Sequence, residues 1–332
     1  MGKSKNIVII VLVVLLSIAL IITFALRQSY SEEKLNIAIT QILEHPALDA
    51  ARQGFIDVFE EHGYIEGDNV VYDIQNAQGE IANTNTIAQK FALDRPDLIL
   101  AISTPSATAL ANAIEDIPIF ITAVTDPVNA GIVESAEKPN TNVTGTTDMN
   151  PIKDQLELLL EISPEVSRVG VIYNAGESNS VVQVNVLRQV AQELGLDIVD
   201  TSISASTEVL TAAKSLSGRV DAIYVPTDNT VISTIESVVG VAENNNIPLI
   251  VGEEHVIERG ALATLSINYY RLGRQTAEMA LEVLEGESIP QEMAIQSQRE
   301  YSLILNTDAA EGMGIVFSDE LLNRADTIYP SN

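Results

Sequence analysis

Apolar residues follow two alternating patterns along the chain after Lys34. Short, almost entirely apolar runs predict buried strands, and longer segments with apolar residues three or four positions apart predict helices. The helix that Pro46 can begin is typical, because it places Ala47, Ala51 and Phe55 at helical spacing before Gly63 ends it. Strands that alternate with helices of this length predict α/β domains built on parallel sheets.

The predicted elements fill the chain from residue 35 to residue 325. Strands are predicted at residues 35–40, 70–74, 98–102, 119–123, 142–146, 169–173, 197–202, 222–225, 249–251, 261–267 and 301–305. Helices are predicted at residues 84–93, 181–194, 208–216, 231–244, 270–284 and 318–325, and further helices begin near Pro46, Pro105 and Pro151. The last strand and helix are too little for a third domain, so we expect them to complete one of two lobes.

The two halves of this pattern repeat one another. RPDLILAISTPSATALA from Arg95 has the same layout as RVDAIYVPTDNTVISTI from Arg219, and the helix-ending Gly63 and Gly195 are 132 residues apart. A nearly constant spacing of this kind is typical of a duplicated unit. The repeat predicts two doubly wound parallel-sheet lobes with a hinge and a central cleft.

The first residues form a separate segment. Residues 7–26 are apolar apart from Ser17 and Thr23, and about 20 helical residues span the hydrocarbon core of a bilayer. Lys3 and Lys5 precede this segment, so the positive-inside rule places that end in the cytoplasm and the remainder outside. Residues 1–34 are therefore predicted to be a cytoplasmic stub, a single-pass anchor and a linker at the cell membrane. A cleaved signal peptide is the alternative, although residues 25–27 match a cleavage site poorly.

Composition excludes several classes of partner and site. The chain has 332 residues, 46% of them hydrophobic, which is enough to bury two cores. It carries a net charge of −28, which argues against nucleic acid and anionic lipid as partners. It has no cysteine, which excludes a lipid-modified cysteine, disulfides and thiolate metal sites.

Candidate binding residues come from the loops at the carboxyl ends of the predicted strands, where open parallel sheets bind ligands. These loops are residues 41–45, 103–106, 125–128, 174–180, 227–230 and 252–255. Ser103, Thr104 and residues 178–180 lie where helices begin, so free N–H groups there favour a carboxylate. Ordinary helix capping explains the same residues.

Asp126 and Asp228 end corresponding strands of the two lobes and are the acidic residues best placed to hold an ammonium group. A turn at Asp126 and a helix cap at Asp228 are the alternatives. Tyr269 and Tyr270 are candidates for stacking on an aromatic ligand, although packing explains them equally well.

Catalytic motifs are absent from the sequence: it has no G-x-S-x-G elbow, no Walker A loop and no G-x-G-x-x-G run. Glu44 with His45, and Glu253 with Glu254 and His255, could ligate a transition metal. A turn and a solvated acidic loop explain these residues as well. We therefore predict no enzyme, no metal site and no cofactor.

Several segments together resemble the ABC transporter substrate-binding protein family that includes the bacterial tryptophan- and tyrosine-binding proteins. They are EHPALDAARQGF from Glu44, AVTDPVNAG from Ala123, NVTGTTD from Asn142, IYNAGESNS from Ile172, PTDNT from Pro226, GALAT from Gly260 and NYYRLGRQTAEMA from Asn268. The resemblance implies a type I periplasmic-binding fold with three crossovers between the lobes. Lobe 1 would comprise residues 35–148 and about 269–297, and lobe 2 residues 149–268 and about 298–332.

The resemblance also implies a function. The chain is expected to be the extracellular substrate-binding component of an ABC importer, which binds an amino acid between its lobes and delivers it to a permease and its ATPase. Aromatic amino acids are among the candidates. An extracellular sensing module that acts through a partner protein is the alternative, and an enzyme is a third option. The expected ligand-binding residues are Glu44, Ser103, Thr104, Asp126, Glu177, Asn179, Ser180, Thr227, Asp228, Asn229, Glu253 and Asn268.

Two departures from the family limit what the resemblance implies. Many relatives have an acidic residue where Asn268 stands, so an ammonium contact at that position does not carry over directly. Many Gram-positive relatives are lipoproteins, whereas this chain has no cysteine to modify. Its tether is therefore expected to be the N-terminal helix.

Overall fold

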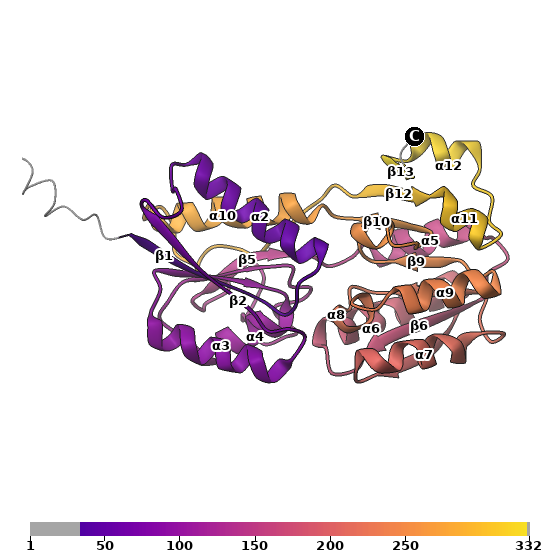
Figure 1. Ribbon diagram of the computed structural model, residues 1–332, viewed down its shortest axis with the longest axis horizontal. Coiled ribbons are helices and arrows are strands. Elements are labelled where there is room, and N and C mark those ends of the chain that lie inside the picture. Colours follow the sequence, from indigo (N-terminus) through magenta and orange to yellow (C-terminus); the bar gives the residue numbers. More distant parts are fainter. Residues whose placement is uncertain (1–33, 331–332) are drawn as a thin grey trace, which may run out of the picture.

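Residues 34–330 of the computed structural model form two α/β lobes that lie side by side (Figure 1). The anchor predicted at residues 7–26 lies outside the described residues. Within residues 34–330, none of the helices combines the length and apolar character needed to span a bilayer.

Lobe 1 is built on a parallel sheet with the strand order β11-β5-β4-β3-β1-β2. Its strands are β1 (Leu35–Gln41), β2 (Val70–Asn76), β3 (Leu98–Ile102), β4 (Ile119–Thr122), β5 (Val143–Thr147) and β11 (Gln296–Ser297). Its helices are α2 (Pro46–Glu61), α3 (Ile81–Asp94), α4 (Thr104–Ala113) and α10 (Tyr269–Leu284). Helices α2 and α10 cover one face of the sheet, and α3 and α4 cover the other (Figure 1).

Lobe 2 is built on a sheet with the order β13-β12-β10-β9-β8-β6-β7. Its strands are β6 (Arg168–Asn174), β7 (Asp197–Ile203), β8 (Ala222–Val225), β9 (Leu249–Val251), β10 (Ala263–Ser266), β12 (Ser302–Asn306) and β13 (Thr327–Tyr329). Its helices are α5 (Ile152–Ile162), α6 (Ser178–Leu194), η1 (Ser206–Glu208), α7 (Val209–Leu216), α8 (Asn229–Ile232), α9 (Glu236–Asn245), η2 (Glu254–Val256), α11 (Thr307–Gly312) and α12 (Asp319–Arg324).

The strand order confirms the predicted two-lobe α/β fold. The orders β2-β1-β3-β4-β5 and β7-β6-β8-β9-β10 are the same when the two lobes are compared strand by strand. In each lobe the strand order reverses between the first and third strands, which are β1 and β3 in lobe 1 and β6 and β8 in lobe 2. The loops that follow these two strands diverge toward opposite faces of the sheet, which makes this position the switch point. The two switch points face each other across the gap between the lobes, so the duplicated topology itself produces the cleft.

The prediction of purely parallel sheets is wrong for one pair, because β10 and β12 are antiparallel. Strand β10 runs toward the other lobe, and the chain then builds α10 and β11 there before it returns. Strand β12 therefore enters lobe 2 from the side at which β10 left it, which reverses its direction.

Five short elements were not predicted, and one predicted helix is divided. Strands β11 and β13 have two and three residues, helix α11 has six, and η1 and η2 have three each, too few for an apolar period to be recognised. The helix predicted at residues 231–244 is instead α8 followed by α9, with a turn at residues 233–235 between them.

Helix α10 follows lobe 2 in the chain but packs on α2 of lobe 1 (Figure 1). The two backbones touch at glycines: a Cβ on Gly54 would lie 2.1 Å from the Tyr270 carbonyl oxygen, and one on Gly273 would lie 1.8 Å from the Ala51 carbonyl oxygen. Only glycine permits the two helix backbones to approach this closely. The contact holds α10 on lobe 1.

Three crossovers join the lobes, at residues 148–151, 267–268 and 298–301. The second and third are tied together by one side chain. Gln298 accepts a hydrogen bond from the Asn268 backbone N–H at 3.1 Å and donates one to the Asn268 carbonyl at 2.7 Å. These two crossovers therefore form a coupled part of the hinge.

Candidate functional site

All six loops at the strand ends contribute to one narrow cavity between the lobes, called here the deep cavity. Its volume is about 10 Å³, which is room for about one water molecule. Its lining residues are His45, Leu48, Thr104, Ala123, Thr125, Asp148, Asn179, Thr227, Asn229, Ile232, Glu253 and Tyr269. The expectation that these loops converge is thus met, with lobe 1 and lobe 2 each supplying part of the wall.

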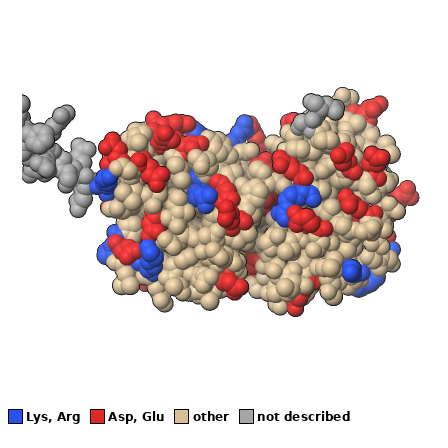
Figure 2. All heavy atoms as spheres, viewed as in Figure 1, with Lys and Arg blue, Asp and Glu red and all other residues tan. Residues whose placement is uncertain are grey.

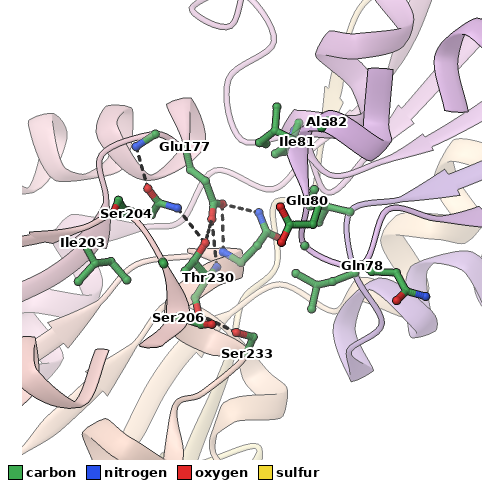
Figure 3. A pocket seen from close by; sticks show the side chains of 18 of the residues that line it. Gln78, Glu80, Ile81, Ala82, Glu177, Ile203, Ser204, Ser206, Thr230 and Ser233 are labelled. Carbon is green, nitrogen blue, oxygen red and sulfur yellow. Dashed lines mark hydrogen bonds between the residues drawn. The ribbon is translucent and has the colours of Figure 1, made fainter. Parts of the chain in front are cut away.

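A second, wider cavity of about 790 Å³ lies beside it and is called here the mouth cavity (Figure 3). Lobe 1 contributes residues of the loops after β1 and β2, and lobe 2 contributes residues of the loops after β6 and β7 and the start of α8. Asn229 lines both cavities, so they are neighbours. A furrow between the lobes is visible in the space-filling view, where acidic side chains outnumber basic ones on the face shown (Figure 2).

Glu253 is the most unusual group of the deep cavity. Its side chain is 1% exposed, and neither carboxyl oxygen has a hydrogen-bond partner within the described part of the chain. Burial, together with the nearby Asp148 carboxyl, raises the pKa of Glu253 to about 8. A buried carboxylate without donors is costly, so this residue is poised to receive a positively charged or hydrogen-donating group.

Asp148 places a second carboxyl on the same cavity, from the first crossover. Its oxygens accept hydrogen bonds from the Thr125 hydroxyl at 2.9 Å and from the Tyr269 hydroxyl at 3.0 Å. Burial raises the pKa of Asp148 above its ordinary value, and these two hydrogen bonds oppose that shift. The cavity therefore has two buried acidic groups, and only one of them has donors.

His45 does not neutralise these carboxyls. It is the N-cap residue of α2, and its Nδ1 accepts a hydrogen bond from the Ala47 backbone N–H at 3.3 Å. Burial, together with the charges of Arg259 and His255, lowers the pKa of His45 to about 3. The imidazole facing Glu253 is therefore neutral at physiological pH.

The beginnings of two helices also line the deep cavity. Thr104 is the first residue of α4 and Asn179 is the second of α6, and the N-cap side chains of both helices accept no capping hydrogen bond from a backbone N–H of their own helix. The Oδ1 atom of Asn179 has no partner among residues 34–330. Uncapped helix N-termini favour an anion such as a carboxylate.

The backbone is strained at the same place. Ser103 and Ala123, at the carboxyl ends of β3 and β4, have φ angles of 83° and 55°. Non-glycine residues rarely adopt positive φ, and such strain is concentrated at functional sites. Both residues adjoin the deep cavity, since Ala123 and Thr104 line it.

Asp228 and Glu177, two of the expected ligand-binding residues, hold the loops of lobe 2 together. Asp228 is fully buried and accepts hydrogen bonds from Asn174 N, Ser180 Oγ and Val231 N at 2.6, 2.6 and 2.8 Å. Burial and the neighbouring Glu177 charge raise the pKa of Asp228 to about 7.

The carboxylate of Glu177 accepts from the backbone and side chains of Asn229 and Thr230 and from Asn179 Nδ2 (Figure 3). Its acceptor positions are therefore occupied within lobe 2. Asp228 and Glu177 thus have their acceptor positions occupied, whereas both carboxyl oxygens of Glu253 lack a partner within residues 34–330.

The other expected residues divide among three locations. Thr104, Asn179, Thr227, Asn229 and Glu253 line the deep cavity, and Glu44, Glu177 and Asn229 line the mouth cavity. Ser103, Asp126, Ser180, Asp228 and Asn268 line neither. Asp126 caps a turn by accepting from Asn129 N, and Asn268 caps α10 by accepting from Arg271 N.

The sequence did not single out Asp148, and it indicated Thr125 and His45 only as members of candidate loops. Asp148 directly follows β5, in the first crossover. The rule that ligands bind at strand ends applied there as well, and it would have identified this carboxylate.

Known proteins are similar to this chain over most of its length. Residues 36–329 match the family model described as "ABC transporter substrate binding protein". A tyrosine-binding protein of Clostridioides difficile (strain R20291) is 46% identical over 287 residues, which cover 86% of this chain and 83% of that protein.

Two solved structures show the same fold in different states. An ABC domain in complex with L-Trp from Streptococcus pneumoniae is 31% identical and has a TM-score of 0.86, with 89% of this chain and 100% of that chain covered. A ligand-free, open substrate binding protein with adhesive properties from Clostridium difficile is 44% identical, with 90% and 99% covered, but its TM-score is only 0.69. The lobe arrangement described here therefore resembles the L-Trp complex more than the open form.

Proposed function

Because this chain belongs to the ABC transporter substrate binding protein family, we propose that it is the extracellular receptor of an ABC importer and closes its two lobes on an amino acid. The family comprises solute-binding proteins rather than enzymes. Relatives that bind tyrosine or L-Trp support an aromatic amino acid as the ligand.

The observation that carries this proposal is the unpartnered carboxyl of Glu253 inside a cavity that both lobes line. An α-ammonium group would pair with Glu253 and Asp148 and supply the donors that Glu253 lacks. The α-carboxylate would lie at the N-termini of α4 and α6, near Thr104 and Asn179, where N–H groups and helix dipoles favour negative charge. A zwitterionic amino acid matches both halves of this arrangement.

Closure follows from the division of these groups between the lobes. Thr104 and Thr125 belong to lobe 1, whereas Asn179, Thr227 and Glu253 belong to lobe 2. A ligand that contacts both sets binds the closed form more tightly than the open form, and this difference shifts the equilibrium toward closure. A permease could then distinguish the loaded receptor by its shape.

The remaining parts of the proposal concern location and delivery. Residues 7–26 would anchor the receptor in the cell membrane with the lobes outside, and the ligand would pass to a permease driven by its ATPase. The alternative is a sensing module that binds the same ligand without transporting it. Uptake of labelled ligand by cells with and without this protein separates the two functions.

The binding proposal is tested by isothermal titration calorimetry on the full chain, purified in detergent and dialysed extensively, against the twenty amino acids. We expect one or a few of them to bind with micromolar or lower Kd. Glu253→Gln keeps the shape of the side chain and removes its charge, and it should weaken binding at least tenfold.

The matched control is Glu287→Gln, an exposed carboxyl outside both cavities, which should leave Kd unchanged. Failure of all twenty amino acids to bind would contradict the proposed ligand class. Binding that is insensitive to Glu253→Gln would contradict the assigned ammonium contact.

A further inference from the structure

The deep cavity is too small for a whole amino acid, whereas the mouth cavity beside it is large. The two volumes are about 10 and 790 Å³. A ligand that pairs with Glu253 in the deep cavity therefore needs another space for its side chain. The mouth cavity meets this need, because Asn229 lines both spaces and both lobes contribute to its wall.

The wall of the mouth cavity is uniformly acidic in its charged residues. Glu44 and Glu80 from lobe 1 and Glu177 from lobe 2 line it, and its lining residues include no lysine, arginine or histidine. Figure 3 shows Glu80 and Glu177 on opposite sides of the space. A side chain that ends in a carboxylate would be repelled by this wall.

The three carboxylates differ in whether they can accept further hydrogen bonds. The oxygens of Glu177 are occupied by Asn179, Asn229 and Thr230. Glu44 and Glu80 are exposed, and within residues 34–330 their carboxylates make neither a hydrogen bond nor an ion pair. Both can therefore accept a hydrogen bond from the far end of a ligand side chain.

From these observations we infer that the mouth cavity is the side-chain subsite of the receptor, and that Glu44 and Glu80 select side chains that end in a hydrogen-bond donor. This inference rests on the proposed function and names its specificity. A phenol hydroxyl, an indole N–H or an ammonium group supplies the donor that this subsite favours, whereas a terminal carboxylate is repelled and a plain hydrocarbon is accommodated without the added hydrogen bond. Since both carboxylates are exposed, the preference for a donor should be about tenfold rather than several orders of magnitude.

The test compares matched pairs of ligands by calorimetry: L-tyrosine with L-phenylalanine, L-lysine with L-norleucine, and L-glutamine with L-glutamate. In every pair that binds, the donor-bearing member should bind about tenfold more tightly. The double variant Glu44→Ala/Glu80→Ala should reduce this ratio to less than threefold and leave the Kd of the hydrocarbon member unchanged. Glu287→Ala serves as the control, since Glu287 is exposed and lines neither cavity.

A second measurement locates the side chain directly. L-Phenylalanine extended by a para-benzoyl group should bind within tenfold of L-phenylalanine, because the mouth cavity has room for the extension. Irradiation should then attach the benzophenone to residues of the mouth, such as Ile81, Ala82 or Ile203, as mapped by mass spectrometry.

The outcomes separate the two proposals. Four results would each overturn this inference. Two come from the affinities: equal Kd values within each pair, or a Kd ratio that is unchanged in the double variant. Two come from the benzoyl derivative: loss of its binding, or adducts outside the mouth cavity. Binding that still depends on Glu253 in those cases would leave the proposed function standing. If no amino acid of the panel binds, the proposed function fails and this inference fails with it.

Discussion

His45 of lobe 1 lies with its Nδ1 atom 3.6 Å from Oε1 of Glu253 in lobe 2. The two groups face one another across the closed cleft without forming a hydrogen bond, since Nδ1 already accepts from Ala47 N. Closing the ligand-free cleft therefore moves the Glu253 carboxyl out of water and places it next to the neutral imidazole of His45, whose Nδ1 is an acceptor. The closed form without ligand is penalised as long as Glu253 is ionised.

This relationship predicts that ligand-free closure depends on pH. In the closed form the pKa of Glu253 is raised from 4.5 to about 8, so closing takes up a proton between these values and becomes less favourable as pH rises through them. The pKa of His45 is lowered from 6.5 to about 3, so closing releases a proton below pH 6.5 and becomes less favourable as pH falls. The two effects oppose each other below pH 6.5, whereas from pH 6.5 to about 8 the effect of Glu253 is not opposed by His45.

The ratio of closed to open ligand-free protein should therefore fall by up to about tenfold per pH unit between pH 6.5 and 8. Small-angle X-ray scattering measures this ratio as a change in radius of gyration. Glu253→Gln should remain equally closed across the interval. A wild-type profile that is flat over this range would show that the proton equilibrium of Glu253 is not coupled to closure.

Asp228 is predicted to be a stability residue. Asp228→Ala leaves the buried donors of Asn174, Ser180 and Val231 without their acceptor, which should lower the free energy of unfolding by about 3 kcal/mol. Urea denaturation measures this loss, and calorimetry on the folded variant should give a ligand Kd within threefold of the wild-type value. A large loss of affinity with unchanged stability would instead place Asp228 in contact with the ligand.

The contact between α2 and α10 should not tolerate a methyl group. Gly54→Ala or Gly273→Ala would drive a Cβ into the backbone of the partner helix, and each should lower the free energy of unfolding by about 3 kcal/mol. Gly240→Ala in α9 is the control, because a Cβ there meets nothing within 4 Å. It should be neutral or stabilising by up to about 1 kcal/mol in thermal denaturation. Equal effects at all three positions would contradict the proposed backbone contact.

Asn268 is predicted to influence closure through Glu254. Its Nδ2 lies 3.3 Å from Oε1 of Glu254, whose pKa burial already raises. Asn268→Asp would place a second carboxyl beside this group, so ligand affinity at pH 8 should fall severalfold and recover toward pH 5, where a carboxyl takes up a proton.

Asn268→Ser provides the control for this prediction, since serine also caps a helix but carries no charge. Titration calorimetry at the two pH values distinguishes the variants. An aspartate variant that matches the serine variant at both values would exclude an electrostatic effect at this position.

Much of the fold follows from local properties of the sequence. Apolar runs, helical spacing and helix-ending residues such as Gly63 and Gly195 act over a few positions, so they predict the strands, the main helices and the repeat. The repeat in turn predicts the loops that form the cleft, because parallel strands place their carboxyl ends at one edge. Elements of two or three residues, such as β11 and β13, carry too little pattern to be predicted in this way.

The roles of individual site residues were decided by the tertiary structure. Asp228 and Glu253 both follow apolar strands of lobe 2, and nothing in their immediate sequence separates a structural carboxyl from a binding one. They differ because Asn174 and Ser180, 54 and 48 residues before Asp228, bring donors to it, whereas Glu253 faces His45 from the other lobe. The sequence determined which loops meet, but the hydrogen bonds that saturate one carboxyl and leave the other free arise only when distant segments are packed together.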